Sequence, residues 1–555
     1  MAQLFEKYVR KDYADYEDFY KNYKLEIPEN FNFAYDCIDE LAKKSPNKLA
    51  MRWTNVAGEK RDFTFAEMKY YSDKTANYLK GLGIGKGDAV MLILKRHYEY
   101  WWTILALHKL GAITIPASNL LTPKDIIYRC NMADIKCIVC TSDGDISHRV
   151  QEAAPECPSL KLLITTNAPE NSGWLDFHKG VNAASEHFTR PTGEAATKNS
   201  DIMLIYFTSG TTGMPKMVAH DYLYALAHIT TAAFWHKVDP DGIHLTVSDT
   251  GWGKAAWGKL YGQWLAETCI MVYDFDKFVP CDLLKIMQDY KITTFCAPPT
   301  IYRFLVKEDM SKYDLSSLKE CTNAGEPLNP EIMDKFREFT GITLREGYGQ
   351  TETTLTLATY PGMRVCPGSM GRPTPGYEIT LLDENGQQVP DGDVGEITIR
   401  ADREHKPVGM FLGYYRDEAL TNSAWHDGYY HTGDTAWRDE HGYYWFVGRT
   451  DDVIKSSGYR IGPFEVESAL LEHPAVLECA ITGMPHPIRG QIVKATVVLS
   501  KGYAPSDELI KELQEHVKHT TAPYKYPRVI EFVEELPKTI SGKIRRVQIR
   551  EEDKG

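Results

Sequence analysis

The chain has 555 residues, of which 43% are hydrophobic and 12% aromatic, and its formal net charge is −13. A chain of this length exceeds one compact core, so two or more domains are expected. The composition is typical of a folded protein and not of a disordered one. The acidic balance argues against a general nucleic-acid or anionic-membrane binder, so any phosphate binding must come from local sites.

The cysteines and the N-terminal segment predict a cytoplasmic protein. Eleven scattered cysteines indicate reduced thiols. Cys137 and Cys140 form a CxxC pattern, but residues three apart on a strand face opposite sides, so a shared metal is not expected. The N-terminal segment is rich in acids and aromatics and resembles neither a secretory signal nor a transit peptide. No apolar run is long enough to predict a membrane span.

Residues 60–345 alternate strand-like and helical patterns, which predicts α/β layers around mostly parallel sheets. The expected strands are 89–94, 113–116, 135–140, 160–165, 202–207, 269–273, 293–297 and 342–344, and the expected helices are 65–82, 98–110, 217–235, 283–290 and 330–339. From about 365 to 450, short strands at 378–382, 396–399 and 443–447 alternate with Asn-Gly, Asp-Gly and His-Gly turns, which predicts a β-rich subdomain.

A small α+β domain is expected after the charged pair Asp451-Asp452. Its expected helices are 463–472 and 506–518, and its expected strands are 478–483 and 492–499. The predicted organisation is therefore a large domain over residues 1–450 and a small C-terminal domain over 451–555. The sequence leaves the oligomeric state open, a homo-oligomer included.

The segment from Thr208 to Lys216 has the composition of a phosphate-binding loop. Small hydroxylated residues and glycines offer hydroxyls and backbone N–H groups to anionic oxygens, and Lys216 adds a positive charge. The loop is not a Walker A motif, because Pro215 precedes the lysine and Met217 replaces the magnesium-binding Ser or Thr. The alternative is a Ser/Thr/Gly-rich surface turn.

Four further segments carry polar residues suited to nucleotide chemistry. In 347–352 an aromatic, a hydroxyl and a carboxylate suit base stacking, phosphate and magnesium, and in 430–434 an aspartate at a glycine turn suits a ribose diol. The other two are the charged junction 448–460 and a lysine on a glycine turn in 537–543. Taken singly, they fit structural turns, a solvated linker and a solvated tail equally well or better.

Taken together, the five segments resemble the AMP-forming acyl-CoA synthetases of the adenylate-forming superfamily, which includes luciferases and peptide-synthetase adenylation domains. The resemblance covers nearly the whole chain. It is closest to the medium-chain acyl-CoA synthetases, whose sequences are similar to residues 248–252, 456–463 and 521–528 of this chain. It implies a ligase that uses ATP, Mg²⁺ and coenzyme A to convert a short- to medium-chain acid, branched or aromatic acids included, to its acyl-CoA through an acyl-adenylate.

The resemblance also implies site residues. Thr208, Lys216, Glu352 and Lys543 would be catalytic, Glu352 would bind the metal, and Asp451 would be the hinge. ATP or AMP would contact Thr208, Ser209, Gly210, Thr211, Thr212, Gly213, Met214, Pro215, Lys216, Gly325, Glu326, Pro327, Glu346, Gly347, Tyr348, Gly349, Gln350, Thr351, Asp434, Arg449 and Lys543. CoA would contact Ser457, Gly458, Tyr459, Arg460, Arg489, Tyr526, Pro527 and Arg528.

The acyl pocket is expected at Trp252, Trp257, Ala324 and Gly349. Acetyl-specific relatives carry Trp at the position of Gly349, so glycine predicts space for a longer or branched acid. Trp257 is either a pocket floor, which favours short, branched acids, or a core residue. Two other hypotheses remain: an enzyme that loads a carrier protein, and a catalytically silent scaffold. Intact Lys216, Glu352, Asp434 and Lys543 argue against the scaffold.

Overall fold

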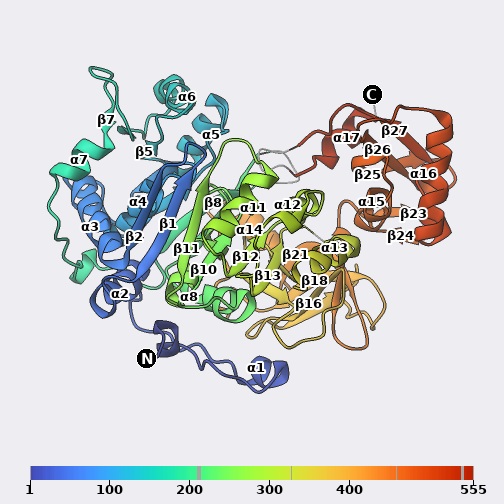
Figure 1. The fold of residues 1–555 in the computed structure, drawn as a ribbon, viewed down its shortest axis with the longest axis horizontal. Helices are drawn as coiled ribbons and strands as arrows, with labels where there is room; N and C mark the ends of the chain where they lie inside the picture. Colours follow the sequence, from blue (N-terminus) through green and yellow to red (C-terminus); the bar gives the residue numbers. More distant parts are fainter. Residues whose placement is uncertain (1, 209–213, 327, 458, 539–542, 554–555) are drawn as a thin grey trace.

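A computed structural model describes residues 2–208, 214–326, 328–457, 459–538 and 543–553. Figure 1 shows a large N-terminal part, coloured blue to orange, and a smaller C-terminal part in red that lies to one side of it. Two sheets with covering helices build the large part, and a third sheet builds the small part. The predicted mixed α/β fold with a smaller C-terminal region is confirmed.

The first sheet is a parallel sheet with antiparallel strands at one edge. Alternate residues of β3 and β5 enter two different core clusters, with Val90 and Cys137 on one face and Met91 and Cys140 on the other. Burial on both faces explains the continuous apolar runs of these strands. In spatial order the strands are β19 (Gly413–Tyr414), β9 (Lys216–Asp221), β8 (Ile202–Thr208), β4 (Ile113–Pro116), β3 (Ala89–Ile93), β5 (Cys137–Cys140), β6 (Leu162–Thr165) and β7 (Leu175–Asp176).

The second sheet runs through the centre of the large part and joins its parallel half to the β-rich subdomain. In spatial order its strands are β17 (Ile379–Leu382), β18 (Gly395–Arg400), β21 (Tyr429–Arg438), β22 (Tyr444–Arg449), β16 (Ser369–Pro373), β15 (Leu355–Ala358), β14 (Arg345–Gly349), β13 (Glu320–Ala324), β12 (Thr294–Ala297), β10 (Ile243–Thr246), β11 (Cys269–Asp274), β1 (Leu49–Asn55) and β2 (Lys60–Thr64), with β20 (Trp425–His426) beside β21.

The C-terminal sheet is a separate hydrophobic unit with its own core cluster, which includes Ile454, Leu470, Val497 and Leu513. In spatial order its strands are β24 (Tyr459–Ile461), β23 (Ile454–Ser456), β26 (Gly490–Leu499) and β25 (Val476–His486), with β27 (Val529–Phe532) also paired to β26.

The helices cover the sheets, and of the seven helices that the sequence predicts, five begin within one residue of the predicted start. Thr64 opens α3 with a capping box to Glu67, and Gly111 ends α4 in the left-handed conformation. The helices of the large part are α1 (Tyr16–Asn22), α2 (Glu40–Lys44), α3 (Phe65–Gly81), α4 (Glu99–Leu110), α5 (Pro123–Ala133), α6 (Ile146–Ala153), α7 (Phe177–Ala183), α8 (Tyr224–Ile229), α9 (Gly253–Gly258), α10 (Tyr261–Leu265), α11 (Pro280–Asp289), α12 (Pro299–Leu305), α13 (Pro330–Thr340) and α14 (Glu418–Ala424). Those of the small part are α15 (Pro463–Leu471), α16 (Asp507–Thr520) and α17 (Arg546–Glu552).

The predicted helix 217–235 is wrong over its first part. Residues Lys216–Asp221 form strand β9, which pairs antiparallel with β8, and the helix α8 starts only at Tyr224 and continues as the π-helical segment η5 (Thr230–His236). Apolar spacing over a short buried run fits a strand and a helix equally well, and the pairing with β8 decides for the strand. The strand expected at 342–344 starts later, at Arg345.

Two smaller expectations concern the cysteines and a membrane span. All eleven cysteines lie in the described part of the chain and are free thiols, and the side chains of Cys137 and Cys140 enter different core clusters, as predicted. Across the described residues, none of the helices combines the length and the apolar character that a membrane crossing requires.

Candidate active site

The ends of the predicted phosphate loop are fixed by two adjacent strands. Thr208 ends β8 and Lys216 starts β9, and the two residues are cross-strand partners. Tyr128 Oη donates a hydrogen bond to the Pro215 carbonyl at 3.0 Å, and Lys216 Nζ lies 5.2 Å from the centroid of the Tyr414 ring. Ser209 to Gly213 lie outside the described residues. The loop therefore connects two strands and not, as expected, a strand and a helix.

Asp434 is a buried carboxylate at the meeting point of three strands. The Tyr348 hydroxyl of β14 and the Gln350 side-chain amide both donate to Asp434 Oδ2 at 2.6 Å. Arg449 of β22 is the cross-strand partner of Asp434, with its Nη1 atom 3.4 Å from Asp434 Oδ1. Burial raises the pKa of the Asp434 carboxyl, and the charge of Arg449 acts in the opposite direction.

Of the two polar segments expected at glycine turns, 430–434 lies in a strand, whereas 347–352 begins in a strand and passes into a turn at Thr351 and Glu352. Residues 347–349 belong to β14, and 430–434 lie within β21. The sheet therefore places the predicted base-stacking aromatic Tyr348 in direct contact with the predicted ribose ligand Asp434, although 86 positions separate them.

Glu352 carries the carboxylate that the family resemblance assigns to Mg²⁺. Its Oε1 atom accepts a hydrogen bond from the Tyr414 hydroxyl at 2.9 Å, and Tyr414 also contacts Lys216, so the carboxylate lies near the phosphate loop. Mg²⁺ in nucleotide sites is held by one or two carboxylates together with substrate phosphates. Within the described ranges, no three His, Cys, Asp or Glu side chains form a protein cage for a metal. A carboxylate beside a phosphate loop fits Mg²⁺ bound with ATP.

His220 holds the backbone of Thr351, the residue expected at the α-phosphate. Its Nε2 atom donates to the Thr351 carbonyl at 2.7 Å, and burial lowers the pKa of His220 to about 3, so the ring is neutral. Neither His220 nor Tyr414 was a sequence-based candidate. Their contacts with Thr351 and Glu352 join residues far apart in the chain, and no local motif marks them.

Glu346, which was expected to contact the nucleotide, instead hydrogen-bonds to the protein backbone. Its two carboxylate oxygens accept the N–H groups of Leu328 and Gly368, at 3.2 and 3.1 Å. Burial raises its pKa to about 8. Glu346 thereby fixes the backbone just after the expected adenine segment Gly325–Pro327, of which Gly325 and Glu326 are exposed and Pro327 lies outside the described residues.

Lys543 lies close enough to the large part to affect its charges. The positive charge of Lys543 lowers the pKa of both Asp434 and Lys254, although burial of each group has the larger effect. A second contact joins the two parts, where Asn329 Nδ2 donates to Ser468 Oγ at 3.2 Å. Lys543 therefore lies within electrostatic range of the predicted ribose site.

The predicted CoA residues form two groups on the small part. Ser457 and Arg489 hydrogen-bond each other twice, at 2.9 and 3.3 Å, and Arg528 Nη1 donates to Tyr526 Oη at 2.7 Å. Arg460 forms an ion pair of 2.9 Å with Glu384 of the large part. Tyr459 is 51% exposed and Gly458 lies outside the described residues; Pro527 follows Tyr526 in the same segment.

Three of the four predicted acyl-pocket residues lie close together, but the space expected beside Gly349 is filled. Trp257 and Ala324 belong to the same core cluster, and a Cβ atom at Gly349 would lie 2.5 Å from Trp257 Cη2 and 2.2 Å from the Thr354 carbonyl oxygen. The Trp257 indole therefore occupies the space beside Gly349 that was expected to be open. Trp252 is partly buried at the start of α9.

Tyr414 links the phosphate loop to Glu352, Asp434 joins three strands, and Lys543 of the C-terminal part lies within electrostatic range of Asp434. This is the arrangement of an adenylate-forming enzyme. Two family models agree with this class. The model of the AMP-binding enzymes matches residues 38–415, and that of the AMP-binding enzyme C-terminal domain matches residues 465–543. The chain belongs to the AMP-binding enzyme family.

Comparison with individual proteins shows to which group of AMP-binding enzymes the chain is most similar. The chain is 43% identical to the human "Acyl-coenzyme A synthetase ACSM3, mitochondrial" over 98% of its length and 93% of that protein. It is 42% identical to the mouse ACSM4 protein, over 95% of this chain and 92% of the other. The predicted medium-chain acyl-CoA synthetase family is confirmed.

Solved structures agree in fold. The anthranilate CoA ligase AuaEII in complex with anthranoyl-AMP has a TM-score of 0.86 and 29% identity, over 95% of this chain and 98% of that one. A benzoate CoA ligase from Burkholderia xenovorans has a TM-score of 0.80 and 28% identity, over 94% and 100%. The chain is thus an AMP-forming acid–thiol ligase: with ATP, Mg²⁺ and CoA it converts a carboxylic acid to its acyl-CoA through an acyl-adenylate.

The predicted cytoplasmic location is wrong. The ACSM3 and ACSM4 relatives, at 41–43% identity, are named as mitochondrial proteins. The sequence argument failed because free cysteines indicate a reducing environment but do not distinguish one reducing compartment from another, and the composition of the N-terminal residues does not decide between them.

Proposed function

We propose that the preferred substrates of this ligase are short carboxylic acids, branched ones included. The observation that carries the proposal is the position of Trp257, whose ring lies within 2.5 Å of a Cβ built at Gly349. A large aromatic ring beside the reacting carboxylate limits acid length, because longer chains would have to displace it. Ala324, in the same cluster, has a small side chain, which would hinder a branched acid less than a larger residue.

For adenylation, we assign charge neutralisation to the loop from Thr208 to Lys216 and to Lys543. The acid's carboxylate oxygen attacks the α-phosphorus of ATP, the bond to the β-phosphate oxygen breaks, and pyrophosphate leaves. Tyr348 would border adenine, and Asp434 with Arg449 would hold the ribose hydroxyls. Glu352 would hold Mg²⁺, which when bound supplies further positive charge at the phosphates. The pairing of Tyr348 with Asp434 supports these places.

For thioester formation, we assign the hinge to Asp451 and the domain boundary to residues 450 and 451. Asp451 lies between β22 and β23, the last strand of the large part and the first of the small one. A turn there would withdraw Lys543 and bring Gly458 and its neighbours to the site. The CoA thiol, on losing its proton, then attacks the acyl carbon, and AMP leaves with the electron pair.

The test is a panel of linear, branched and aromatic acids of about two to ten carbons, assayed for CoA-dependent AMP formation. The proposal expects the highest kcat/KM for a short acid, with a steep fall as the chain lengthens. A preference for a long or an aromatic acid would contradict it. AMP formation that requires a carrier protein and not CoA would instead support the carrier-loading hypothesis.

A further inference from the structure

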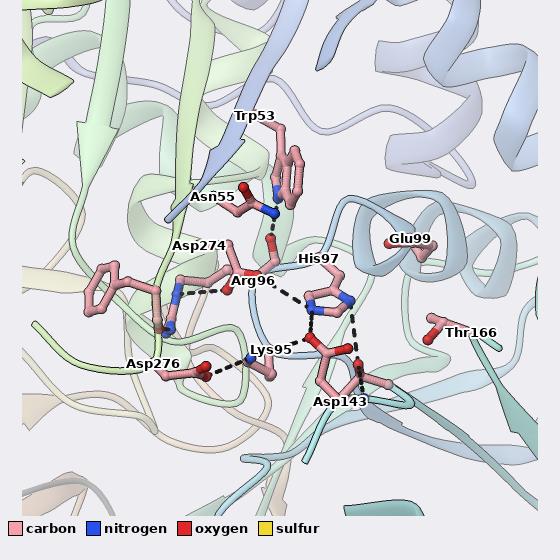
Figure 2. Close-up of polar contacts among 12 residues, drawn as sticks. Trp53, Asn55, Lys95, Arg96, His97, Glu99, Asp143, Thr166, Asp274 and Asp276 are labelled. Carbon is pink, nitrogen blue, oxygen red and sulfur yellow. Dashed lines mark hydrogen bonds and ion pairs between the residues drawn. The ribbon is translucent and has the colours of Figure 1, made fainter. Parts of the chain in front are cut away.

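A second polar cluster lies outside the nucleotide site, on the loop that follows β3 (Figure 2). Lys95, Arg96 and His97 succeed one another there and meet carboxylates from both sheets. Lys95 pairs with Asp276 at 2.6 Å, and His97 Nε2 lies 3.0 Å from Asp143 Oδ2. The cluster therefore joins the first sheet to the second at the ends of β3 and β11.

Arg96 is a buried member of this cluster, next to the equally buried Lys95. Only 9% of its surface is exposed, and its guanidinium stacks 4.4 Å over the Phe275 ring. Its Nη1 atom lies 3.1 Å from Asp249 Oδ2 and its Nε atom 3.5 Å from Asp274 Oδ1, while Nη2 donates to the Phe275 carbonyl. A buried guanidinium with these partners holds them in a fixed geometry, because its donors form a rigid planar fork.

Asp249 connects Arg96 to the loop formed by residues 249–251. Its other oxygen, Oδ1, accepts the Gly251 N–H at 2.9 Å, and Thr250 Oγ1 donates to the Lys95 carbonyl. Gly251 packs so closely on the neighbouring backbone that a Cβ there would lie 2.5 Å from the Ala117 carbonyl carbon. Residues 249–251 therefore have little freedom while Arg96 holds Asp249.

Helix α9 starts directly after this loop and carries the wall of the acyl pocket. Lys254 Nζ donates to the Ala324 carbonyl at 2.7 Å, and a Cβ at Gly253 would lie 3.9 Å from Thr351 Cγ2. Trp257 lies one turn further on, against Gly349. At the other end of α9, Lys259 Nζ donates back to the Ser248 carbonyl at 2.7 Å. The loop and the helix thus form one closed unit.

We infer that Arg96 is a positioning residue for acid selectivity: through Asp249 it sets the position of α9 and hence of Trp257 in the acyl pocket. The inference rests on the assignment of Trp257 to that pocket. Arg96 itself touches none of the predicted nucleotide ligands among the described residues. Its loss should therefore affect the use of the acid much more than the use of ATP.

The test uses Arg96→Lys and Asp249→Asn, singly and together. Lysine keeps the charge but loses the fork, and asparagine removes the charge of the partner. For each variant, KM for the acid, KM for ATP and kcat are measured with the acid that the wild type uses best, and kcat/KM is compared across the panel. The matched control is Arg52→Lys, which breaks a 2.8 Å pair with Asp62 on the exposed side of β1.

In each single variant we expect kcat/KM for the acid to fall about tenfold or more, through a higher KM, a lower kcat or both. A displacement of the bound acid by about 1 Å is enough to cause a loss of this size. KM for ATP should stay within about twofold of the wild type, and the order of acids should change. The double variant should cost less than the sum of the two single ones, because both break one contact. Arg52→Lys should leave all of these quantities unchanged.

A merely structural role would give another pattern. If Arg96→Lys lowers Tm while kcat/KM falls by one common factor for every acid, or if KM for ATP rises as much as KM for the acid, the inference is overturned. A wild type that prefers long or aromatic acids would contradict the proposed short substrate and not this inference, because the comparison is then made with that acid.

Discussion

The Tyr348 hydroxyl donates a 2.6 Å hydrogen bond to Asp434 Oδ2, and this contact joins β14 to β21 at the point where the nucleotide is expected. The same oxygen accepts the amide of Gln350, so Tyr348 and Gln350 fix the direction of the carboxylate. The remaining oxygen, Oδ1, faces Arg449 at 3.4 Å. A carboxylate held in this way is preorganised to bind a vicinal diol.

The first prediction concerns Asp434→Asn. Replacement of the carboxylate removes hydrogen bonds to a charged group, each worth about 1.5–3 kcal/mol. We therefore expect KM for ATP to rise by roughly 10- to 100-fold, with KM for the acid nearly unchanged. Steady-state kinetics with each substrate varied in turn provide the measurement. An equal rise of both KM values would show that Asp434 supports the whole site and not the ribose.

The second prediction concerns Trp257→Ala. If the indole limits the acyl pocket, its removal should move the preference to longer acids, by up to about 0.8 kcal/mol for each additional buried methylene. Trp264→Ala is the matched control, because Trp264 is fully buried in another cluster; it should cost about 3–5 kcal/mol of stability and leave the order of acids unchanged. If Trp257→Ala lowers Tm but leaves the order of preferred acids unchanged, Trp257 is a core residue and not part of the acyl pocket.

Gly349→Trp is a poor test of the same pocket. A Cβ at this position would lie 2.2 Å from the Thr354 carbonyl oxygen, which is backbone and cannot move aside easily. The glycine is required for this close approach and for the Trp257 ring beside it. Gly349→Ala should therefore already lower Tm, and a thermal melt of that variant is the check; an unchanged Tm would contradict the close approach.

The third prediction concerns the hinge. Asp451→Pro fixes φ and removes the N–H, so we expect acyl-adenylate to form while transfer to CoA nearly stops. Asp451→Ala is the control, because alanine keeps both backbone dihedrals free, and it should retain transfer. Single-turnover measurements of adenylate and of acyl-CoA separate the two steps. Normal turnover in Asp451→Pro would place the pivot elsewhere.

The fourth prediction concerns pH and the pair formed by His178 and Glu99, whose Nε2 and Oε1 atoms are 2.9 Å apart. The hydrogen bond to Glu99 raises the pKa of His178 above its ordinary value of 6.5. The pair therefore stabilises the fold fully below pH 6.5, and this contribution is lost as the pH rises through the folded-state pKa.

We accordingly expect His178→Gln to lower the urea midpoint more at about pH 6 than at about pH 9. His148→Gln, at an exposed position of α6, serves as the control and should show no such difference. An equal loss of stability at both pH values in His178→Gln would mean that the ring contributes by packing and not by its charge.

The buried strands show how far the sequence predicts the fold. β4 has the predicted bounds, and β3 and β12 differ by one residue, because strands buried on both faces give continuous apolar runs. The predicted helix 217–235 was wrong over its first part because a strand and a helix follow each other without a turn signal in one apolar stretch. Tertiary pairing with β8 decides that conformation, and no local pattern records it.

In the candidate site, too, the residue types could be read from the sequence but the contacts between distant strands could not. Lys216, Glu352 and Asp434 could be chosen as candidates from the sequence because their residue types suit phosphate, Mg²⁺ and ribose. The contacts that orient them, from Tyr414 to Glu352 and from His220 to Thr351, join distant strands and are visible only in the structure. The closeness of Trp257 to Gly349 likewise depends on how α9 packs against β14.

The central claim is that Lys543 serves adenylation alone, in an enzyme that makes acyl-CoA in two separate steps. The most direct measurement compares both half-reactions in Lys543→Ala: acid-dependent exchange of pyrophosphate into ATP, and CoA-dependent thioester formation from supplied acyl-adenylate. Loss of one electrostatic donor should lower the exchange by about 10²-fold or more, while thioester formation proceeds near the wild-type rate. An equal fall in both half-reactions would contradict the account.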